Sequence, residues 1–291
     1  MKLGRIGIWA FLDMLPAAEA QAAAREVEDL GFEALWIPEA IGREIFTSSA
    51  ILLAGTKKLA IATGIANVWA RDAMAMANAQ RTLCEAYPER FLLGIGVSHA
   101  PLIDAVRGHH YAKPLTYMRK YLDAMDQAPF AGAPPPSPPR RVIAALHPKM
   151  LELAREKSWG SHPYFVPPEH TARARKALGA DRLLAPEQAV VLETDPAKAR
   201  AIARQHMAIY LGLPNYCRNL LTLGFTQEDL ASGGSDRLVD AIVAWGDVET
   251  VRARVKAHHD AGADHVCLQA LEANMAELPR GQWRQLAKAL L

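Results

Sequence analysis

The chain repeats one pattern along almost all of its 291 residues: a short apolar, β-branched run followed by a segment typical of a helix. Such alternation predicts an α/β fold in which helices cover a parallel sheet. The eight strand-like segments are residues 5–10, 34–37, 59–65, 91–97, 142–145, 164–166, 183–193 and 265–269. Eight units in a chain slightly longer than the typical ~250 residues favour a (β/α)8 TIM barrel.

A doubly wound open sheet is the alternative to the barrel. That fold usually carries a GxGxxG turn after its first strand, where a dinucleotide phosphate binds. The first strand-like segment is instead followed by FLDMLPAAEA, which contains no glycine. The sequence therefore favours the barrel over the open sheet.

Two segments interrupt the alternation. Residues 129–140 are rich in proline and predict an extended surface loop, because proline-rich segments are stiff and extended. A strand-like segment follows at once, so we interpret residues 1–291 as a single domain. Residues 211–243 are mostly helical with breaks at glycines, and predict a helical insertion before the last β unit.

Composition excludes several classes of protein. Lys and Arg total 33 against 31 Asp and Glu, so the chain lacks the excess of positive charge expected of a nucleic-acid partner. No apolar run approaches the roughly 20 residues of a membrane span, so we expect no membrane partner. Three widely spaced cysteines suggest a reduced, cytoplasmic protein without disulfides.

The active site of a barrel enzyme lies where the strands end at the C-terminal face. Here these positions are Trp9, Pro38, Glu39 and residues 64–71, 96–99, 146–149 and 160–164. They are rich in aromatic residues, histidines and glycines, and Glu39 is the only acidic residue among them. A metal-dependent hydrolase needs converging His and Asp ligands and a glycosidase needs paired carboxylates, so neither class fits, and we expect no metal. Aromatic walls with glycines better suit a planar cofactor.

Several blocks of sequence resemble a known family. They are ALWIPEA, ATGIANVWARD, RFLLGIGVSHAP, KMLELAREK, PEHTARARKALG and the closing AWGD…AHHDAGADHV. Together they resemble the luciferase-like monooxygenase superfamily, and within it the branch of oxidoreductases that depend on coenzyme F420, a 5-deazaflavin. The resemblance covers almost the whole chain.

The resemblance implies a barrel, often assembled as a homodimer, with the deazaflavin in its mouth. The cofactor would exchange a hydride with an unidentified small organic substrate. In relatives, a bulge with a cis non-prolyl peptide ends the third strand and supports the ring, and the matching pair here is Gly64-Ile65. The loop at 146–149 would receive the phosphate of the cofactor tail, since a helix N-terminus attracts anions. The full set of expected cofactor contacts is Trp9, Glu39, Thr63, Gly64, Ile65, Asn67, Val97, Ser98, His99, Leu146, His147, Pro148, Lys149, Ser161 and His162.

One departure from the family affects the expected chemistry. Relatives that oxidise a sugar phosphate carry an Asp-His pair after the second strand, where this chain has Glu39-Ala40. We expect Glu39, His99 and Arg71 as the catalytic residues, and Trp69, Arg71 and Tyr164 as substrate contacts. Two alternatives remain: an FMN-dependent monooxygenase, and a non-catalytic protein that binds a flavin or deazaflavin.

Overall fold

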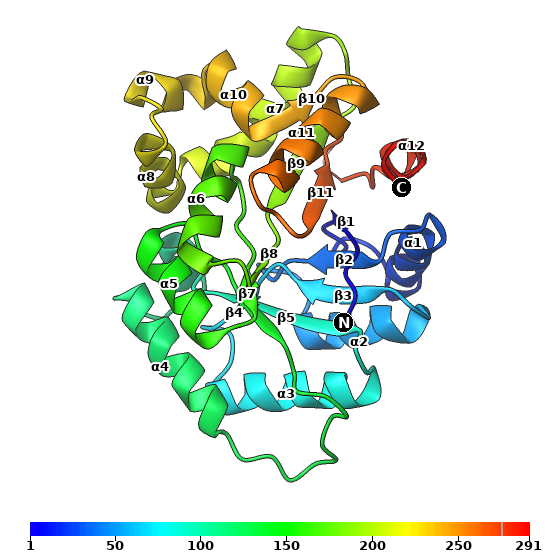
Figure 1. Cartoon of the computed structure of the whole chain (residues 1–291), viewed down its shortest axis with the longest axis vertical. Coiled ribbons are helices and arrows are strands. Elements are labelled where there is room, and N and C mark those ends of the chain that lie inside the picture. Colours follow the sequence, from blue (N-terminus) through cyan, green and yellow to red (C-terminus); the bar gives the residue numbers. More distant parts are fainter. Residues whose placement is uncertain (275) are drawn as a thin grey trace.

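The computed structural model describes residues 1–274 and 276–291 as an α/β fold with parallel strands (Figure 1). Its strands are β1 (Ile6–Trp9), β2 (Ala34–Ile37), β3 (Ala60–Thr63), β4 (Ala66–Asn67), β5 (Phe91–Gly96), β6 (Arg141–Ile143), β7 (Gly160–Ser161), β8 (Leu183–Leu184), β9 (Glu187–Val191), β10 (Val243–Trp245) and β11 (Val266–Ala270). The pairing order is β10-β9-β11-β1-β2-β3-β5-β6-β7-β8, with β4 beside β5. The parallel, helix-covered sheet confirms the predicted α/β class.

The two ends of this order are joined through the stretch from β8 to β9. β8 pairs with β7, whereas β9 pairs with β11, and only Ala185 and Pro186 separate the two strands. The path of strands therefore returns to itself, as in a barrel. β10 lies outside this path and pairs with β9.

The helices follow the strands in sequence and surround them (Figure 1). They are α1 (Ala17–Asp29), α2 (Ile45–Gly55), α3 (Ala73–Ala86), α4 (Pro114–Gln127), α5 (Pro148–Lys157), α6 (Pro168–Leu178), α7 (Pro196–Leu211), α8 (Pro214–Thr222), α9 (Gln227–Leu230), α10 (Asp236–Ile242), α11 (Val248–Asp260) and α12 (Arg280–Leu290). A π-helix at Pro101–Val106 and a 3₁₀ turn at Ala231–Gly233 complete the set. Figure 1 shows α7 to α10 gathered at one end of the molecule.

A separate cluster of buried residues joins α7, α8 and α10 to β9 and β10. Around the other strands, alternation of side chains separates two further clusters. Ile8, Leu35 and Ile61 pack against helical residues such as Ala24 and Leu52. A second cluster contains no helical residue and is built from strand positions that include Trp9, Trp36, Ala62, Leu92 and Cys267. This second set fills the interior of the barrel, as side chains do in small barrels.

The sixth predicted strand was misplaced. Residues 164–166 are not a strand, since Phe165 has a positive φ of 60°, and the pairing is made by β7 instead. β7 lies close against β8 because Gly160 has no side chain: a Cβ there would lie 1.9 Å from the Leu183 carbonyl oxygen. The predicted seventh strand is divided into β8 and β9.

The two segments that interrupt the alternation differ in structure. Residues 128–140 contain neither helix nor strand. Residues 211–243 are largely helical, through α8, α9, the 3₁₀ turn and α10. Across the described chain, no helix has both the length and the apolar character needed to cross a membrane.

Candidate active site

A cavity of about 460 Å³ opens where the barrel strands end. Residues that directly follow β1, β2, β3, β5, β6 and β7 line it, together with residues of α7 and α8. The predicted site residues among them are Trp9, Glu39, Gly64, Ile65, Val97, Ser98, His99, Leu146, His147, Lys149, His162 and Tyr164. The structure therefore brings most of the expected contacts into one cavity.

The other expected residues lie outside this cavity. Thr63 is buried and exchanges hydrogen bonds with Gly94, and the Ser161 hydroxyl donates to the Ile143 carbonyl at 2.9 Å. These two side chains are thus occupied within the sheet. Asn67 and Pro148 do not line the cavity either. Trp69 and Arg71 line a neighbouring open pocket of about 530 Å³ that shares Glu39 with the cavity.

The peptide between Gly64 and Ile65 is cis, as expected from the resemblance. The backbone here is held to β2, because the Gly64 N–H donates to the Ile37 carbonyl at 2.7 Å. Gly64 has no room for a side chain. A Cβ at this position would lie 2.6 Å from Trp9 Nε1 and 2.9 Å from His162 Nε2.

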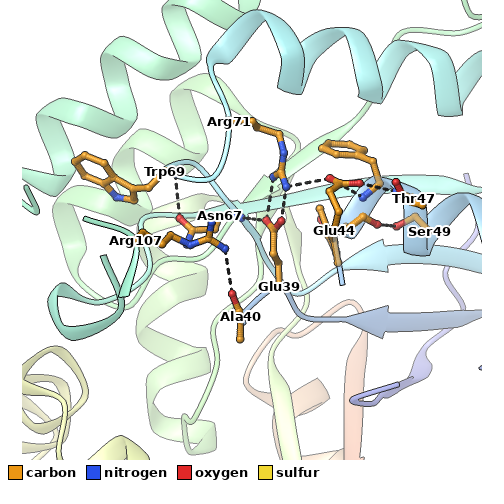
Figure 2. Close-up of polar contacts among 12 residues, drawn as sticks. Glu39, Ala40, Glu44, Thr47, Ser49, Asn67, Trp69, Arg71 and Arg107 are labelled. Atoms are coloured by element: carbon orange, nitrogen blue, oxygen red, sulfur yellow. Dashed lines mark hydrogen bonds and ion pairs between the residues drawn. The ribbon is translucent and has the colours of Figure 1, made fainter. Parts of the chain in front are cut away.

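Glu39 forms an ion pair with Arg71 instead of presenting a free carboxylate (Figure 2). Arg71 Nη1 donates to Glu39 Oε2 at 2.9 Å, and Nη2 contacts the other oxygen of the same carboxylate. The Asn67 backbone N–H also donates to Oε2, at 2.7 Å. Arg71 contacts Glu44 as well, at 3.0 Å. Glu39 and Arg71, which we expected to be catalytic, are therefore bound to each other.

His99, the third residue that we expected to be catalytic, is not bound to another side chain that the structure describes. It follows β5, lines the cavity, and its ring makes no hydrogen bond to any other residue that the structure describes. Its ring centroid lies 5.2 Å from that of Tyr216. Burial lowers the pKa of His99 below its usual value of 6.5, so the ring is neutral at pH 7. A neutral imidazole can accept a proton.

One wall of the cavity comes from α7 and α8 and was not predicted from the sequence. Tyr210, Tyr216, Asn215 and Arg218 all line it. Tyr164 connects this wall to the barrel, because its hydroxyl lies 2.8 Å from that of Tyr210 and donates to Gln269 at 2.7 Å. No local pattern marks these residues, since only the packing of α8 over the mouth brings them to the site.

One rim of the cavity carries positive charge. Lys149 lies in the first turn of α5 and Arg218 lies on α8, and both side chains are exposed. Neither makes an ion pair with a described carboxylate. His147 Nε2 lies 3.1 Å from Asn215 Oδ1 and joins the two elements. This rim has the charge needed to hold an anionic group.

The chain was also compared with known proteins. The model of the luciferase-like monooxygenase family matches residues 5–265. A Mycobacterium tuberculosis protein, provisionally assigned as a coenzyme F420-dependent oxidoreductase, is 28% identical over 96% of this chain and 97% of its own. A 5,10-methylenetetrahydromethanopterin reductase of Methanolobus tindarius is 28% identical over 70% of this chain and 71% of its own.

Among solved structures, an F420-dependent secondary alcohol dehydrogenase with a bound F420-acetone adduct has a TM-score of 0.78. It is 16% identical, and the match covers 100% of this chain and 98% of that one, so it shows the shared fold. The family match spans most of the chain and includes every barrel strand up to β9, together with β10. The chain therefore belongs to the luciferase-like monooxygenase family, whose members are enzymes.

Proposed function

We propose that this protein is an oxidoreductase that binds coenzyme F420 in the barrel cavity and uses it to oxidise or reduce a small organic substrate. The name of the Mycobacterium tuberculosis relative and that of the alcohol dehydrogenase of similar fold, which both include F420, support F420 as the cofactor. The observation that carries the proposal is the combination of one cavity, apolar and aromatic inside, with two cations at its rim. A flat ring suits the interior, and an anionic tail suits the rim.

Two buried nitrogens provide a test of whether the residues fit such a ring. Trp9 Nε1 and His162 Nε2 are buried and have no hydrogen-bond partner among the described residues. Buried polar groups in proteins are nearly always satisfied, so unpaired ones beside a cavity indicate a ligand. The residues present therefore fit a planar polar ring.

The proposed chemistry divides the work between cofactor and protein. The deazaflavin, when bound, supplies the carbon that exchanges a hydride with the substrate. Lys149 and Arg218 would hold the phosphate and tail, and the tyrosines of α7 and α8 would keep water from the substrate. We also propose that α8, α9 and α10 are the helical insertion expected before the last β unit.

We assign proton transfer to His99 and not to Glu39. Glu39 and Arg71 are bound to each other, whereas His99 is neutral and its ring has no hydrogen-bond partner among the residues that the structure describes. If the substrate is an alcohol, His99 would accept the hydroxyl proton while the bound cofactor takes the hydride. In the reverse direction His99 returns the proton to the carbonyl oxygen. Proton transfer by a positioned histidine contributes roughly 10²–10⁴ in rate.

Titration of the purified protein with F420 and with FMN tests the proposal. We expect F420 to bind more tightly, because its longer anionic tail reaches the cationic rim. Anaerobic incubation of the F420 complex with a panel of alcohols, followed by absorbance, then shows whether the cofactor is reduced. Tighter binding of FMN with oxygen consumption would instead support a monooxygenase. Binding of F420 with neither reduction of F420 by the alcohols nor oxidation of reduced F420 by the matching ketones would favour a non-catalytic binder.

A further inference from the structure

The barrel interior contains two tryptophan–histidine pairs, and one of them is complete. The Trp36 indole N–H donates to His265 Nε2 at 3.1 Å. The opposite ring nitrogen of His265 donates to the Gly4 carbonyl at 2.9 Å. Since an indole has only one polar atom and an imidazole two, every polar atom of this pair has a partner.

The second pair is incomplete. His162 Nδ1 lies 2.7 Å from the Ala185 carbonyl, which can only accept, so Nδ1 carries the proton. His162 Nε2 therefore presents a lone pair, and it has no partner among the described residues. The Trp9 indole N–H likewise lacks an acceptor within the described chain. Both side chains are at most 3% exposed.

The incomplete pair belongs to the cavity, whereas the complete pair does not. Trp9 and His162 both line the cavity, and Trp36 and His265 are absent from its lining. The two unpaired nitrogens both lie within 3 Å of the position that a Cβ of Gly64 would take, at 2.6 Å for Trp9 Nε1 and 2.9 Å for His162 Nε2. A fixed donor and a fixed acceptor are therefore placed side by side. They complement a ligand edge that presents an acceptor next to a donor.

We propose that Trp9 and His162 recognise the imide edge of the bound ring, with a ring carbonyl accepting from Trp9 and the adjacent N–H donating to His162. The inference rests on the proposed function, because it takes the ligand to be a flavin-type ring. Deazaflavin and FMN share this edge, so the pair selects the ring class and the cationic rim selects between the two cofactors. His162 suits this role because its protonated nitrogen is fixed by Ala185 and its other nitrogen can only accept.

The ligand itself can be changed to test the contact. The wild-type protein is titrated with F420, with F420 methylated at the imide nitrogen (N3), and with FMN, and binding is followed by fluorescence. We expect methylation to weaken binding at least 10-fold, since it removes the donor that faces His162. In protein labelled with ¹⁵N-histidine, the His162 Nε2 resonance should move upfield with F420 and not with the methylated ligand. The NMR arm separates a lost hydrogen bond from simple crowding by the methyl group.

Matched tryptophan variants test the donor. Trp9→Phe should weaken F420 binding about 5- to 10-fold, because it removes the N–H and keeps an aromatic ring. Trp36→Phe loses the same atoms from the complete pair and leaves His265 Nε2 without its donor. It should therefore lower the melting temperature more than Trp9→Phe does.

The outcomes separate the two proposals. If F420 binds but methylation and Trp9→Phe leave its affinity unchanged, the pair does not recognise the ring, and the proposed function stands. An equal loss of melting temperature in both variants would show that Trp9 and His162 bond to each other, which also overturns the inference. If neither F420 nor FMN binds the wild-type protein, the proposed function falls together with it. If FMN binds more tightly, the choice of F420 falls, and N3-methylated FMN then tests the pair.

Discussion

Glu39 and Glu44 contact the same guanidinium from different surroundings. The Glu39 side chain is 4% exposed and that of Glu44 is 49% exposed, while Arg71 between them is 12% exposed. Removing one partner of a buried ion pair leaves a charge unpaired, so Glu39→Gln should cost about 2–4 kcal/mol of unfolding free energy. Glu44→Gln is the control and should cost less than about 1 kcal/mol, as exposed pairs do. Urea denaturation of both variants measures the difference, and equal losses would contradict the assigned burial.

Lys149 is the residue whose proposed role depends most directly on charge. If its ammonium contacts the phosphate of F420, Lys149→Gln should weaken F420 binding about 10-fold at low salt. The effect should shrink as ionic strength rises, because the contact lies at an exposed rim. Lys120 on α4 is exposed and does not line the cavity, so Lys120→Gln is the matched control. An unchanged dissociation constant for Lys149→Gln would place the phosphate elsewhere.

The rule that barrel sites lie at strand ends predicted many of the cavity residues from sequence, including Trp9, Gly64, His99 and His162. It could not separate lining side chains from those turned into the sheet. Ser161 and His162 are neighbours, yet one bonds the Ile143 carbonyl and the other reaches the cavity. It also could not supply Tyr216, because that residue arrives from a helix remote in sequence.

At the scale of single elements, two glycines in different surroundings allow a direct comparison. A Cβ on Gly160 would lie 1.9 Å from the Leu183 carbonyl oxygen, within the β7–β8 pair. Gly160→Ala should therefore destabilise the protein by more than about 3 kcal/mol, since only a backbone shift could make room. Gly281 lies in the first turn of α12 with open space around it. Gly281→Ala should stabilise the protein by about 0.5 kcal/mol, through helix propensity. Thermal unfolding of the two variants checks both signs.

Helix starts carry clearer local signals in the sequence than short strands do. Asp72, Asp195 and Asp247 each cap a helix, because their side chains accept from backbone N–H groups of the first turn. These signals are local and depend only on neighbouring residues. By contrast, β7 and β10 have two and three residues, and long-range pairing alone defines them. Propensity instead favoured the apolar Tyr164–Val166 stretch, which packs as an irregular segment.

At the scale of the whole molecule, the interior holds several histidines in their neutral form. Burial lowers the pKa of His162, His170, His206 and His265 to about 4 and that of His258 to about 3. In the unfolded chain each would titrate near 6.5. Glu187 acts in the opposite direction, because burial raises its pKa to about 8. At pH 7 the folded state therefore keeps these five histidines unprotonated and the carboxyl group of Glu187 protonated.

These groups predict that the protein loses stability on mild acidification. Between pH 7 and 5.5 the unfolded histidines gain protons that the folded ones do not, which costs roughly 1 kcal/mol per histidine. The protonated Glu187 offsets roughly 2 kcal/mol of this loss over the same interval. The net effect is a lower free energy of unfolding at pH 5.5 than at pH 7, which urea denaturation at the two pH values measures. His206 packs against Phe165 and Tyr210, and its Nε2 has no hydrogen-bond partner within the described part of the chain. His206→Phe should reduce the pH-dependent loss by about one histidine's share, and an unchanged loss would show that His206 is not kept neutral in the folded protein.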